Sequence, residues 1–184
     1  MQISEAPIQG VFRMRTEPVG DARGWFGRLY CAEEMRQAGM DDFQLQQANG
    51  SHTEKRGAFR GLHYQEAPHC ETKIVRCVRG AVFDIVVDLR RGSSTFLKVH
   101  CEELSENAHN ALFIPKGCAH GFQVLSEGAD LLYLHDVAYV AAAARTINVA
   151  SPVLRVALPL PMTDVSERDR TAPHVSQDFE GVVL

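Results

Sequence analysis

The sequence predicts an all-β protein of the jelly-roll type, built as an antiparallel sandwich or barrel. Short segments rich in β-branched and aromatic residues follow one another at near-regular spacing, with turn signals between them. Before the C-terminus, only one segment has the composition of a helix. A chain of 184 residues that is 45% hydrophobic can bury one sizeable core, so we expect a single domain over residues 1–184.

The N-terminal part is expected to contain one strand, one turn and one helix. Residues 7–15 alternate weakly between apolar and polar side chains and predict the first strand. Residues 21–24 predict a turn, which two aromatic residues follow. Residues 31–38 are good helix formers, and Gly39 is expected to end this short N-terminal helix.

The strands of the barrel are expected between residues 43 and 139. Their predicted ranges are 43–50, 57–65, 72–79, 81–89, 96–104, 110–114, 119–125 and 130–139. The tail from about residue 150 is rich in proline, which favours an ordered wrap over the barrel with a small helical segment rather than another strand. No internal repeat or linker interrupts this order.

Composition excludes several classes of function. A net charge of −4 provides no basic surface for nucleic acid, so we expect no nucleic-acid partner. Five cysteines without C-x-x-C spacing are typical of a reduced cytoplasmic protein. The N-terminal residues do not resemble a signal peptide, and no apolar run approaches the roughly 18 residues of a membrane span. We expect a soluble cytoplasmic protein with no membrane partner.

The expected strand around His63 is the most informative stretch for chemistry. Period-2 alternation places one set on the His63 face (Phe59, Gly61, His63 and Gln65) and another on the opposite face (Arg60, Leu62 and Tyr64). If Gly61 forms a bulge, Arg60 turns to the side of His63. Taken alone, His63 is more simply a half-buried histidine paired with an acid. Asp84 can pair with His63 or with an arginine.

A second motif is the Pro-x-Gly-x-x-His sequence of residues 115–120. It resembles the second signature of the cupin superfamily, in which the turn delivers a histidine (here His120) into the mouth of a small jelly-roll barrel. Metal-dependent cupins add a His-x-His motif with a following glutamate, whereas this chain has only His63 at that place. Two histidines are a poor site for tightly bound zinc or iron. We therefore expect no metal and no cofactor; a metal-dependent cupin enzyme using these two histidines is an alternative.

Taken together, the motifs resemble those of the dTDP-4-dehydrorhamnose 3,5-epimerase family of nucleotide-sugar epimerases. The resemblance runs in order from about residue 21 to residue 173, nearly the whole chain. The matching segments are Asp21-x-Arg23-Gly24-x-Phe26, Gln47-x-Asn49-x-Ser51, Arg60-Gly61-Leu62-His63-Tyr64-Gln65, Lys73-Ile74-Val75-Arg76, Gly80-x-Val82-Phe83-Asp84-x-x-Val87-Asp88-Leu89-Arg90, Ser94-Thr95-Phe96, Leu104-Ser105, Ile114-Pro115-x-Gly117-x-Ala119-His120-Gly121-Phe122, Leu132-Tyr133 and Ser166-x-Arg168-Asp169. The resemblance implies a metal-free homodimer with a cupin fold that acts on a nucleotide sugar.

Inverting a carbon next to a C4 ketone requires a base on one face of the sugar, an acid on the other and stabilisation of the enolate oxygen. The resemblance implies that His63 is the base, which suits its ordinary pKa near 6.5. It further implies that Asp169 orients His63, that Tyr133 is the acid and that Lys73 stabilises the enolate. Each of the last three also has a structural interpretation: Asp169 as a helix cap or surface charge, Tyr133 as a core aromatic and Lys73 as a strand lysine with an exposed head group.

A second set of residues is implied to bind the nucleotide and the sugar. Arginine suits diphosphate, amide side chains can read the edge of a pyrimidine, and an aromatic ring can stack on it. No Walker A or dinucleotide-binding glycine motif is present. The expected substrate-binding residues are Arg23, Phe26, Gln47, Asn49, Arg60, His120, Tyr139 and Arg168.

The chain departs from the family pattern at three places. Arg28 stands where the pattern after Phe26 has a glutamate, residues 140–145 read Val-Ala-Ala-Ala-Ala-Arg in place of a segment with proline and glutamate, and Ser151 replaces an aspartate. These changes leave open a different nucleotide or sugar. A C3-only epimerase is a further alternative, because inversion at C5 depends on the pose of Tyr133. A non-catalytic sugar-nucleotide binding module is the alternative from another class.

Overall fold

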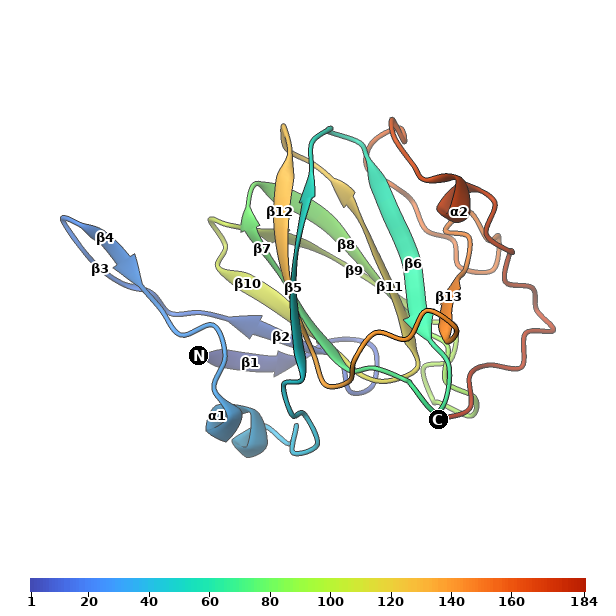
Figure 1. Ribbon diagram of the computed structural model, residues 1–184, viewed down its shortest axis with the longest axis horizontal. Coiled ribbons are helices and arrows are strands. Elements are labelled where there is room, and N and C mark those ends of the chain that lie inside the picture. The colour runs from blue at the N-terminus through green and yellow to red at the C-terminus, as the bar shows by residue number, and fades with distance from the viewer.

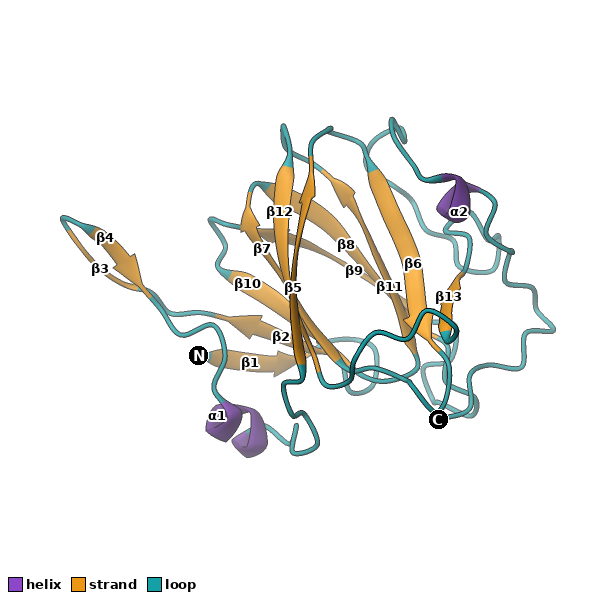
Figure 2. Ribbon diagram, in the orientation of Figure 1, coloured by secondary structure: helices purple, strands orange, loops and turns teal.

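The computed structural model describes residues 1–184 as two antiparallel sheets that pack against each other, with one projecting hairpin (Figures 1 and 2). In spatial order, the first sheet contains β1 (Gln2–Glu5), β2 (Phe12–Arg15), β10 (Asn110–Ile114), β7 (Lys73–Arg79), β12 (Ala129–His135) and β5 (Gln47–Thr53). The second contains β13 (Ala144–Thr146), β6 (Phe59–Gln65), β11 (Cys118–Val124), β8 (Ala81–Asp88) and β9 (Val99–Ser105). The hairpin consists of β3 (Val19–Asp21) and β4 (Gly24–Phe26). This arrangement confirms the predicted all-β jelly roll.

Three apolar clusters hold the elements together. The largest fills the space between the sheets with side chains such as Val75, Val86, Leu112, Phe122 and Leu131. A second lies between the sheet that contains β6 and the C-terminal tail, and includes Leu62, Ile85, Ile147, Leu154 and Val182. A third packs helix α1 (Ala32–Gln37) on the other sheet, through Met35, Phe43, Ile74, Phe113 and Leu134. Burial of apolar surface at about 25 cal/mol per Å² makes these clusters the main stabilising contacts.

Most predicted elements are present, with shifted ends. The predicted first strand, residues 7–15, is wrong in its first half: the chain forms β1 before it, turns at residues 6–11 and re-enters the sheet only at β2. Residues 43–46 lie outside the strand, where Phe43 packs under α1, and β5 begins at Gln47. The strand predicted for 130–139 ends at His135. Composition did not indicate the short strands β1, β3, β4 and β13.

The C-terminal tail wraps the outer face of the sheet that contains β6, as predicted. Two parallel bridges, between Phe59 and Val165 and between Arg90 and Val182, fasten it to the barrel. Between them lies the one-turn helix α2 (Glu167–Arg170). Ser166 caps its N-terminus, because the side-chain oxygen accepts a hydrogen bond from the backbone N–H of Asp169. The tail therefore brings a short helix that carries Asp169 next to β6. No helix in the chain has the length and apolar character needed to cross a membrane.

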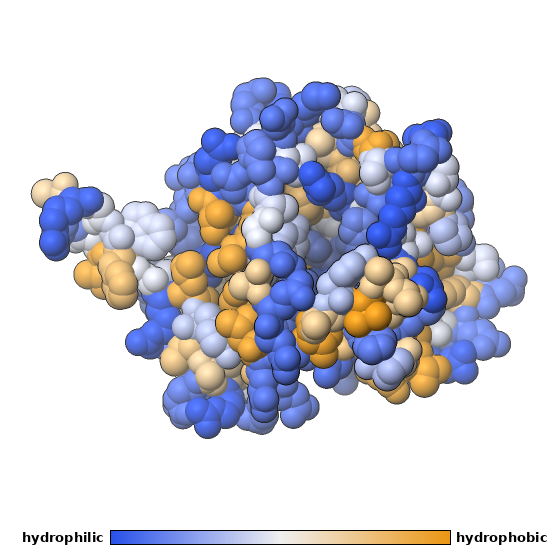
Figure 3. Space-filling view, in the orientation of Figure 1, coloured by the Kyte–Doolittle hydropathy of each residue, from blue (hydrophilic) through white to orange (hydrophobic).

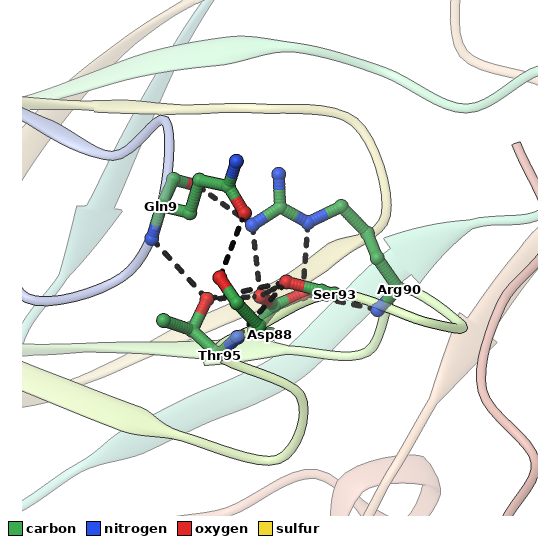
Figure 4. Close-up of polar contacts among 6 residues, drawn as sticks. Gln9, Asp88, Arg90, Ser93 and Thr95 are labelled. Carbon is green, nitrogen blue, oxygen red and sulfur yellow. Dashed lines mark hydrogen bonds and ion pairs between the residues drawn. The ribbon is translucent and has the colours of Figure 1, made fainter.

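A buried carboxylate, Asp88, ties two loops together at one end of the barrel (Figure 4). It accepts hydrogen bonds from Arg90 Nε at 2.8 Å, Ser93 Oγ at 2.6 Å and Thr95 Oγ1 at 2.6 Å. Arg90 also donates to the backbone oxygen of Gln9 at 2.6 Å, which joins the loop after β8 to the loop after β1. Burial alone raises the pKa of Asp88, but these hydrogen bonds outweigh it and lower the pKa to about 2.

We expect Asp88→Ala to lower the free energy of unfolding by about 3–5 kcal/mol, because it leaves a partly buried arginine and two hydroxyls without their acceptor. Urea denaturation at neutral pH measures this change. The folded-state pKa of Asp88 lies below its unfolded value, so its contribution is present above pH ~4 and is lost as the pH falls through about 2. Glu127→Ala, an exposed carboxylate in the turn before β12, is the control and should change stability by less than about 0.5 kcal/mol. An equal effect of the two variants would contradict the assignment.

Candidate active site

A cavity of about 480 Å³ lies between the two sheets at the end opposite the apolar core. One wall is formed by β5, β12 and β7, and the other by β6 and β11. Its lining is mostly polar: His63, Lys73, Glu71, His120, Tyr133, His135, Gln47, Asn49, Arg60 and Arg168 all contribute. A concave site with converging titratable groups is the expected form of an enzyme pocket.

A bulge at Gly61 orients the β6 wall. The register pairs His63 with His120 and Arg60 with Phe122, so three steps along β6 match two along β11. The added residue turns Arg60 to the same side as His63, and both line the cavity. The bulge is therefore confirmed. The strict alternation that placed Phe59 on the His63 face is wrong, because Phe59 lies in the cluster under the tail.

Only glycine fits at the bulge. Gly61 has a φ of +140°, and a Cβ there would lie 2.5 Å from the Cα of Gly121 on β11. A Cβ at Gly121 would in turn lie 2.6 Å from the backbone oxygen of Arg60. The two strands therefore approach each other more closely than any residue with a side chain allows.

His63 is paired with a buried aspartate from the tail. Its Nε2–H donates to Asp169 Oδ1 at 2.7 Å, and Asp169 Oδ2 accepts from the backbone N–H of Gly61 at 3.2 Å. Burial raises the pKa of Asp169, but the hydrogen bonds and the charge of His63 lower it overall. Asp169 is thus neither a cap nor a surface charge. When His63 is neutral, this bond leaves Nδ1 as the nitrogen with a free lone pair.

Tyr133 lies on β12, on the wall opposite His63, between two other histidine rings. Its ring makes an edge contact with His120 at a centroid distance of 6.2 Å and stacks on His135 at 6.1 Å. Burial raises the pKa of Tyr133 well above its ordinary value near 10, so the phenol keeps its proton at neutral pH. A protonated tyrosine facing a carboxylate-oriented histidine across a cavity can serve as an acid opposite a base.

The carboxylate of Asp84 pairs with His120, a partner that was not expected. The Nε2–H of His120 donates to the fully buried Asp84 at 2.8 Å, so the prediction that Asp84 pairs with His63 or an arginine is wrong. The strand register explains this pairing, because β11 lies between β6 and β8 and separates Asp84 from His63. His120 is therefore held rigidly at the cavity wall.

Lys73 is buried rather than exposed at its head group, with 6% of its side chain accessible. Its Nζ donates to Glu71 Oε1 at 2.6 Å, and His135 Nδ1–H donates to the other oxygen of Glu71 at 2.9 Å. Burial raises the pKa of Glu71, but these contacts outweigh it and lower the pKa to about 2. Glu71 and His135 were not predicted. The signal in the sequence was their spacing. Glu71 lies two residues before Lys73, and His135 lies two residues after Tyr133, so period-2 alternation places each on the same face as that residue.

The other expected binding residues divide into two groups. Gln47, Asn49, Arg60, Tyr139 and Arg168 line the cavity. Arg23 and Phe26 do not: they belong to the β3–β4 hairpin, which projects away from the barrel (Figure 1). The side chain of Phe26 is 82% exposed, and the arm at the left of Figure 3 carries hydrophobic residues in orange and tan. Within one chain neither residue reaches the cavity, because a short ribbon with few packing contacts holds them away from it, so their expected role in substrate binding stays a prediction.

The departures from the family pattern lie in different parts of the structure. Arg28 lies outside the cavity and forms an ion pair with Glu34 of α1. Arg145, from the alanine-rich segment, lines the cavity and pairs with Glu66 at 2.8 Å. The charge reversal at residue 28 therefore supports the N-terminal helix and leaves the wall of the cavity in the same chain unchanged.

The histidines do not form a metal site. The chain contains no group of three or more histidine, cysteine, aspartate or glutamate side chains arranged to hold a metal ion. The Nε2 atoms of His63 and His120 are both engaged by carboxylates. Two histidines without a third ligand are a poor donor set for a tightly bound zinc or iron ion.

A jelly roll of the cupin type, with a carboxylate-paired histidine facing a partly buried tyrosine across a concave polar cavity, has the architecture of an enzyme with its active site between the two sheets. Comparison with known proteins gives the family: the profile of dTDP-4-dehydrorhamnose 3,5-epimerase matches residues 5–177. The chain belongs to the dTDP-4-dehydrorhamnose 3,5-epimerase family, which confirms the resemblance of its motifs.

Individual relatives cover nearly the whole chain. A dTDP-4-dehydrorhamnose 3,5-epimerase of Streptomyces griseus is 34% identical over 92% of this chain and 84% of its own length. A dTDP-4-dehydrorhamnose 3-epimerase of Streptomyces niveus is 35% identical over 94% and 83%. The structure of the dTDP-6-deoxy-D-glucose-3,5-epimerase of Legionella pneumophila in complex with dTDP-4-keto-L-rhamnose superposes with a TM-score of 0.89, at 32% identity over 94% and 92%.

We expect Gly61→Ala to destabilise the fold and to disturb the site, because the added methyl group meets Gly121 and the residue keeps a φ that side chains disfavour. The free energy of unfolding should fall by about 1–3 kcal/mol, as measured by urea denaturation. Gly50→Ala on β5 is the matched control, since an added Cβ there meets no atom within 4 Å. A Gly61→Ala protein as stable as the control would show that β6 and β11 are not in close contact.

Proposed function

We propose that the protein is an epimerase that inverts C3 and C5 of a nucleoside-diphosphate 4-keto-6-deoxyhexose, as in the conversion of dTDP-4-dehydro-6-deoxyglucose to dTDP-4-dehydrorhamnose. The observation that carries the proposal is the placement of the His63–Asp169 pair and the partly buried Tyr133 on opposite walls of one cavity. Inversion requires such a placement, since a proton leaves one face of the sugar and another arrives on the opposite face.

In the first step, Nδ1 of His63 removes the proton from a carbon next to the C4 ketone. The electron pair of the C–H bond becomes the C=C bond of an enolate, and the negative charge moves to the C4 oxygen. Asp169 accepts the hydrogen bond from Nε2–H and stabilises the imidazolium that forms. A positioned base of this kind contributes about 10²–10⁴-fold to the rate.

In the second step, Tyr133 returns a proton to the same carbon from the other face. The C4 carbonyl re-forms, and Tyr133 becomes a phenolate that must regain a proton while His63 loses one, so no net proton is consumed. Burial keeps Tyr133 protonated until the enolate accepts its proton. The same two steps at the second carbon complete the double inversion.

The enolate oxygen needs donors between the two walls. Lys73 supplies a buried ammonium, and His120 lies on the wall of His63 as a possible helper. Removing one preorganised donor of this kind costs about 2.7–4 kcal/mol of transition-state stabilisation. Lys73 is therefore expected to matter about as much as the base.

The nucleotide is proposed to lie against the remaining polar residues of the cavity, which are Gln47, Asn49, Arg60, Tyr139 and Arg168. Two arginines near the mouth suit a diphosphate. The ligand named for the Legionella pneumophila structure, dTDP-4-keto-L-rhamnose, supports this chemistry for a related protein. The sugar-nucleotide substrate also accords with a single-domain protein that works in the cytoplasm.

The projecting hairpin supports a homodimer. Val19, Trp25 and Phe26 are all more than half exposed, which is unfavourable for an arm that remains in water. We propose that the hairpin packs on a second copy of the chain and that Arg23 and Phe26 complete the cavity of that copy. The two residues then bind substrate as their sequence motif implies, although their own chain holds them away from its cavity.

Incubation of the protein with dTDP-4-keto-6-deoxyglucose in heavy water, followed by proton NMR, should remove the C3 and C5 signals. His63→Gln should slow this exchange by about 10²–10⁴-fold, because the base is lost. Tyr133→Phe should block inversion while retaining exchange. His174→Gln, an exposed histidine of the tail, is the control.

The same spectra separate the alternatives. Exchange at C3 alone would indicate a 3-epimerase like the Streptomyces niveus relative. Exchange only with the UDP or GDP form of the sugar would indicate a different nucleotide. No exchange with any form, together with unchanged binding by His63→Gln, would contradict the proposal and favour a binding module.

The dimer is tested by mixing two inactive variants. His63→Gln has an intact hairpin, and an Arg23→Ala/Phe26→Ala variant has an intact cavity. If hairpins are exchanged between copies, mixed dimers contain one complete site, and refolding the two variants together should restore a substantial part of the activity. Activity that stays at the level of the separate variants would show that the hairpin does not serve a neighbouring cavity.

A further inference from the structure

Glu71 holds two basic side chains next to each other at the cavity wall. Lys73 is the first residue of β7 and His135 the last of β12, and the strand register pairs them directly. One oxygen of the Glu71 carboxylate accepts from Lys73 Nζ at 2.6 Å and the other from His135 Nδ1 at 2.9 Å. All three line the cavity. The expected mechanism assigns a role to Lys73 but none to Glu71 or His135.

The net charge of the group formed by Glu71, Lys73 and His135 depends on the protonation of His135. The single negative charge of Glu71 compensates the ammonium of Lys73, so these two together present no net charge to a developing enolate. If His135 is protonated, the group carries one net positive charge, which matches the one negative charge of the enolate.

The hydrogen bond to Glu71 also determines which ring nitrogen remains available. Because Nδ1–H donates to the carboxylate, Nε2 is the nitrogen without a partner in the chain. Stacking on Tyr133 at 6.1 Å with an interplanar angle of 14° holds the ring parallel to that of the expected acid. Lys73 and His135 are therefore two donors on adjacent strands, next to the residue that reprotonates the sugar.

We propose that His135 is a further catalytic residue of this enzyme: in its protonated form, it donates a hydrogen bond from Nε2 to the enolate oxygen beside Lys73. Glu71 is the positioning residue that holds both donors. This inference rests on the proposed epimerase function and adds a second cationic donor to it. Two donors at the oxygen place the developing charge between groups that are already oriented before the reaction.

The role of His135 gives a defined pH dependence. The proposed roles require a neutral His63 and a protonated His135, so the kcat profile is expected to have both an acidic and an alkaline limb. Tyr133 does not cause the alkaline limb, because burial raises its pKa. The neighbouring Asp136 is directed away: it accepts from the backbone N–H of Thr72 and pairs with Lys116 Nζ. The groups that face His135 are Glu71 and Lys73 from the β7 side, Gln47 from β5, Tyr133 on its own strand, and His63 and the His120–Asp84 pair from the opposite sheet.

The test compares His135→Gln and Glu71→Gln with the wild-type protein by the heavy-water exchange assay and by calorimetric titration with dTDP. We expect kcat to fall at least about 10-fold in each variant, with dTDP affinity unchanged, because the lost contact forms only with the enolate. The alkaline limb of the kcat profile should disappear in His135→Gln. The double variant should be no slower than Glu71→Gln, since the two residues act as one unit.

His52→Gln is the matched control. His52 on β5 also pairs with a carboxylate, that of Asp130, but lies outside the cavity, so its kcat should match the wild type. A second measurement does not depend on the variants folding: ¹⁵N NMR of the histidine rings should show His135 protonated on both nitrogens in the wild-type complex with the sugar nucleotide.

Three results would overturn the inference alone, with wild-type exchange intact: a kcat within twofold of wild type in His135→Gln, a lower kcat with the alkaline limb unchanged, or a neutral His135 ring in the complex. Absence of exchange by the wild-type protein with any nucleotide form would instead reject the proposed function, and this inference with it.

Discussion

The space between the two sheets has to be apolar at one end and polar at the other, and the rest of the structure depends on this division. Individual strands show it along one face. On β12, Leu131 lies in the core, whereas Tyr133 and His135 line the cavity; on β7, Val75 lies in the core and Lys73 lines the cavity. The buried apolar end supplies the stability that allows the other end to remain open and charged.

Charged groups at the polar end are stable because each has a partner, and the partners come from different parts of the chain. Asp169 arrives from the tail, Asp84 from β8 and Glu71 from the segment before β7. Removing a charge from water is costly unless hydrogen bonds and an opposite charge replace it. The C-terminal wrap is therefore part of the site as well as of the fold, because α2 delivers the carboxylate that orients His63.

Sequence patterns predicted the strands well, because side-chain period and turn residues are local properties. They also predicted that a glycine bulge turns Arg60 toward His63, since Gly61 interrupts an otherwise regular strand. They did not predict the partner of Asp84 or the contact between Glu71 and His135, because these depend on which strands are neighbours and in what register. The binding roles expected of Arg23 and Phe26 stay predictions for another reason: one chain does not contain the surface on which the hairpin is proposed to pack.

The two walls of the cavity differ in their access to water, and this difference suits their proposed roles. The side chain of His63 is 42% exposed, so a proton that it removes can exchange with solvent before the sugar leaves. Tyr133 is shielded by the rings of His120 and His135, and its proton is retained until an enolate forms beside it. With an accessible base and a shielded acid, the proton of Tyr133 is transferred to a carbon only after the enolate has formed there. The fold produces this asymmetry by placing the base beside the bulge in β6, where its side chain is partly exposed, and the acid between two histidine rings on the opposite wall.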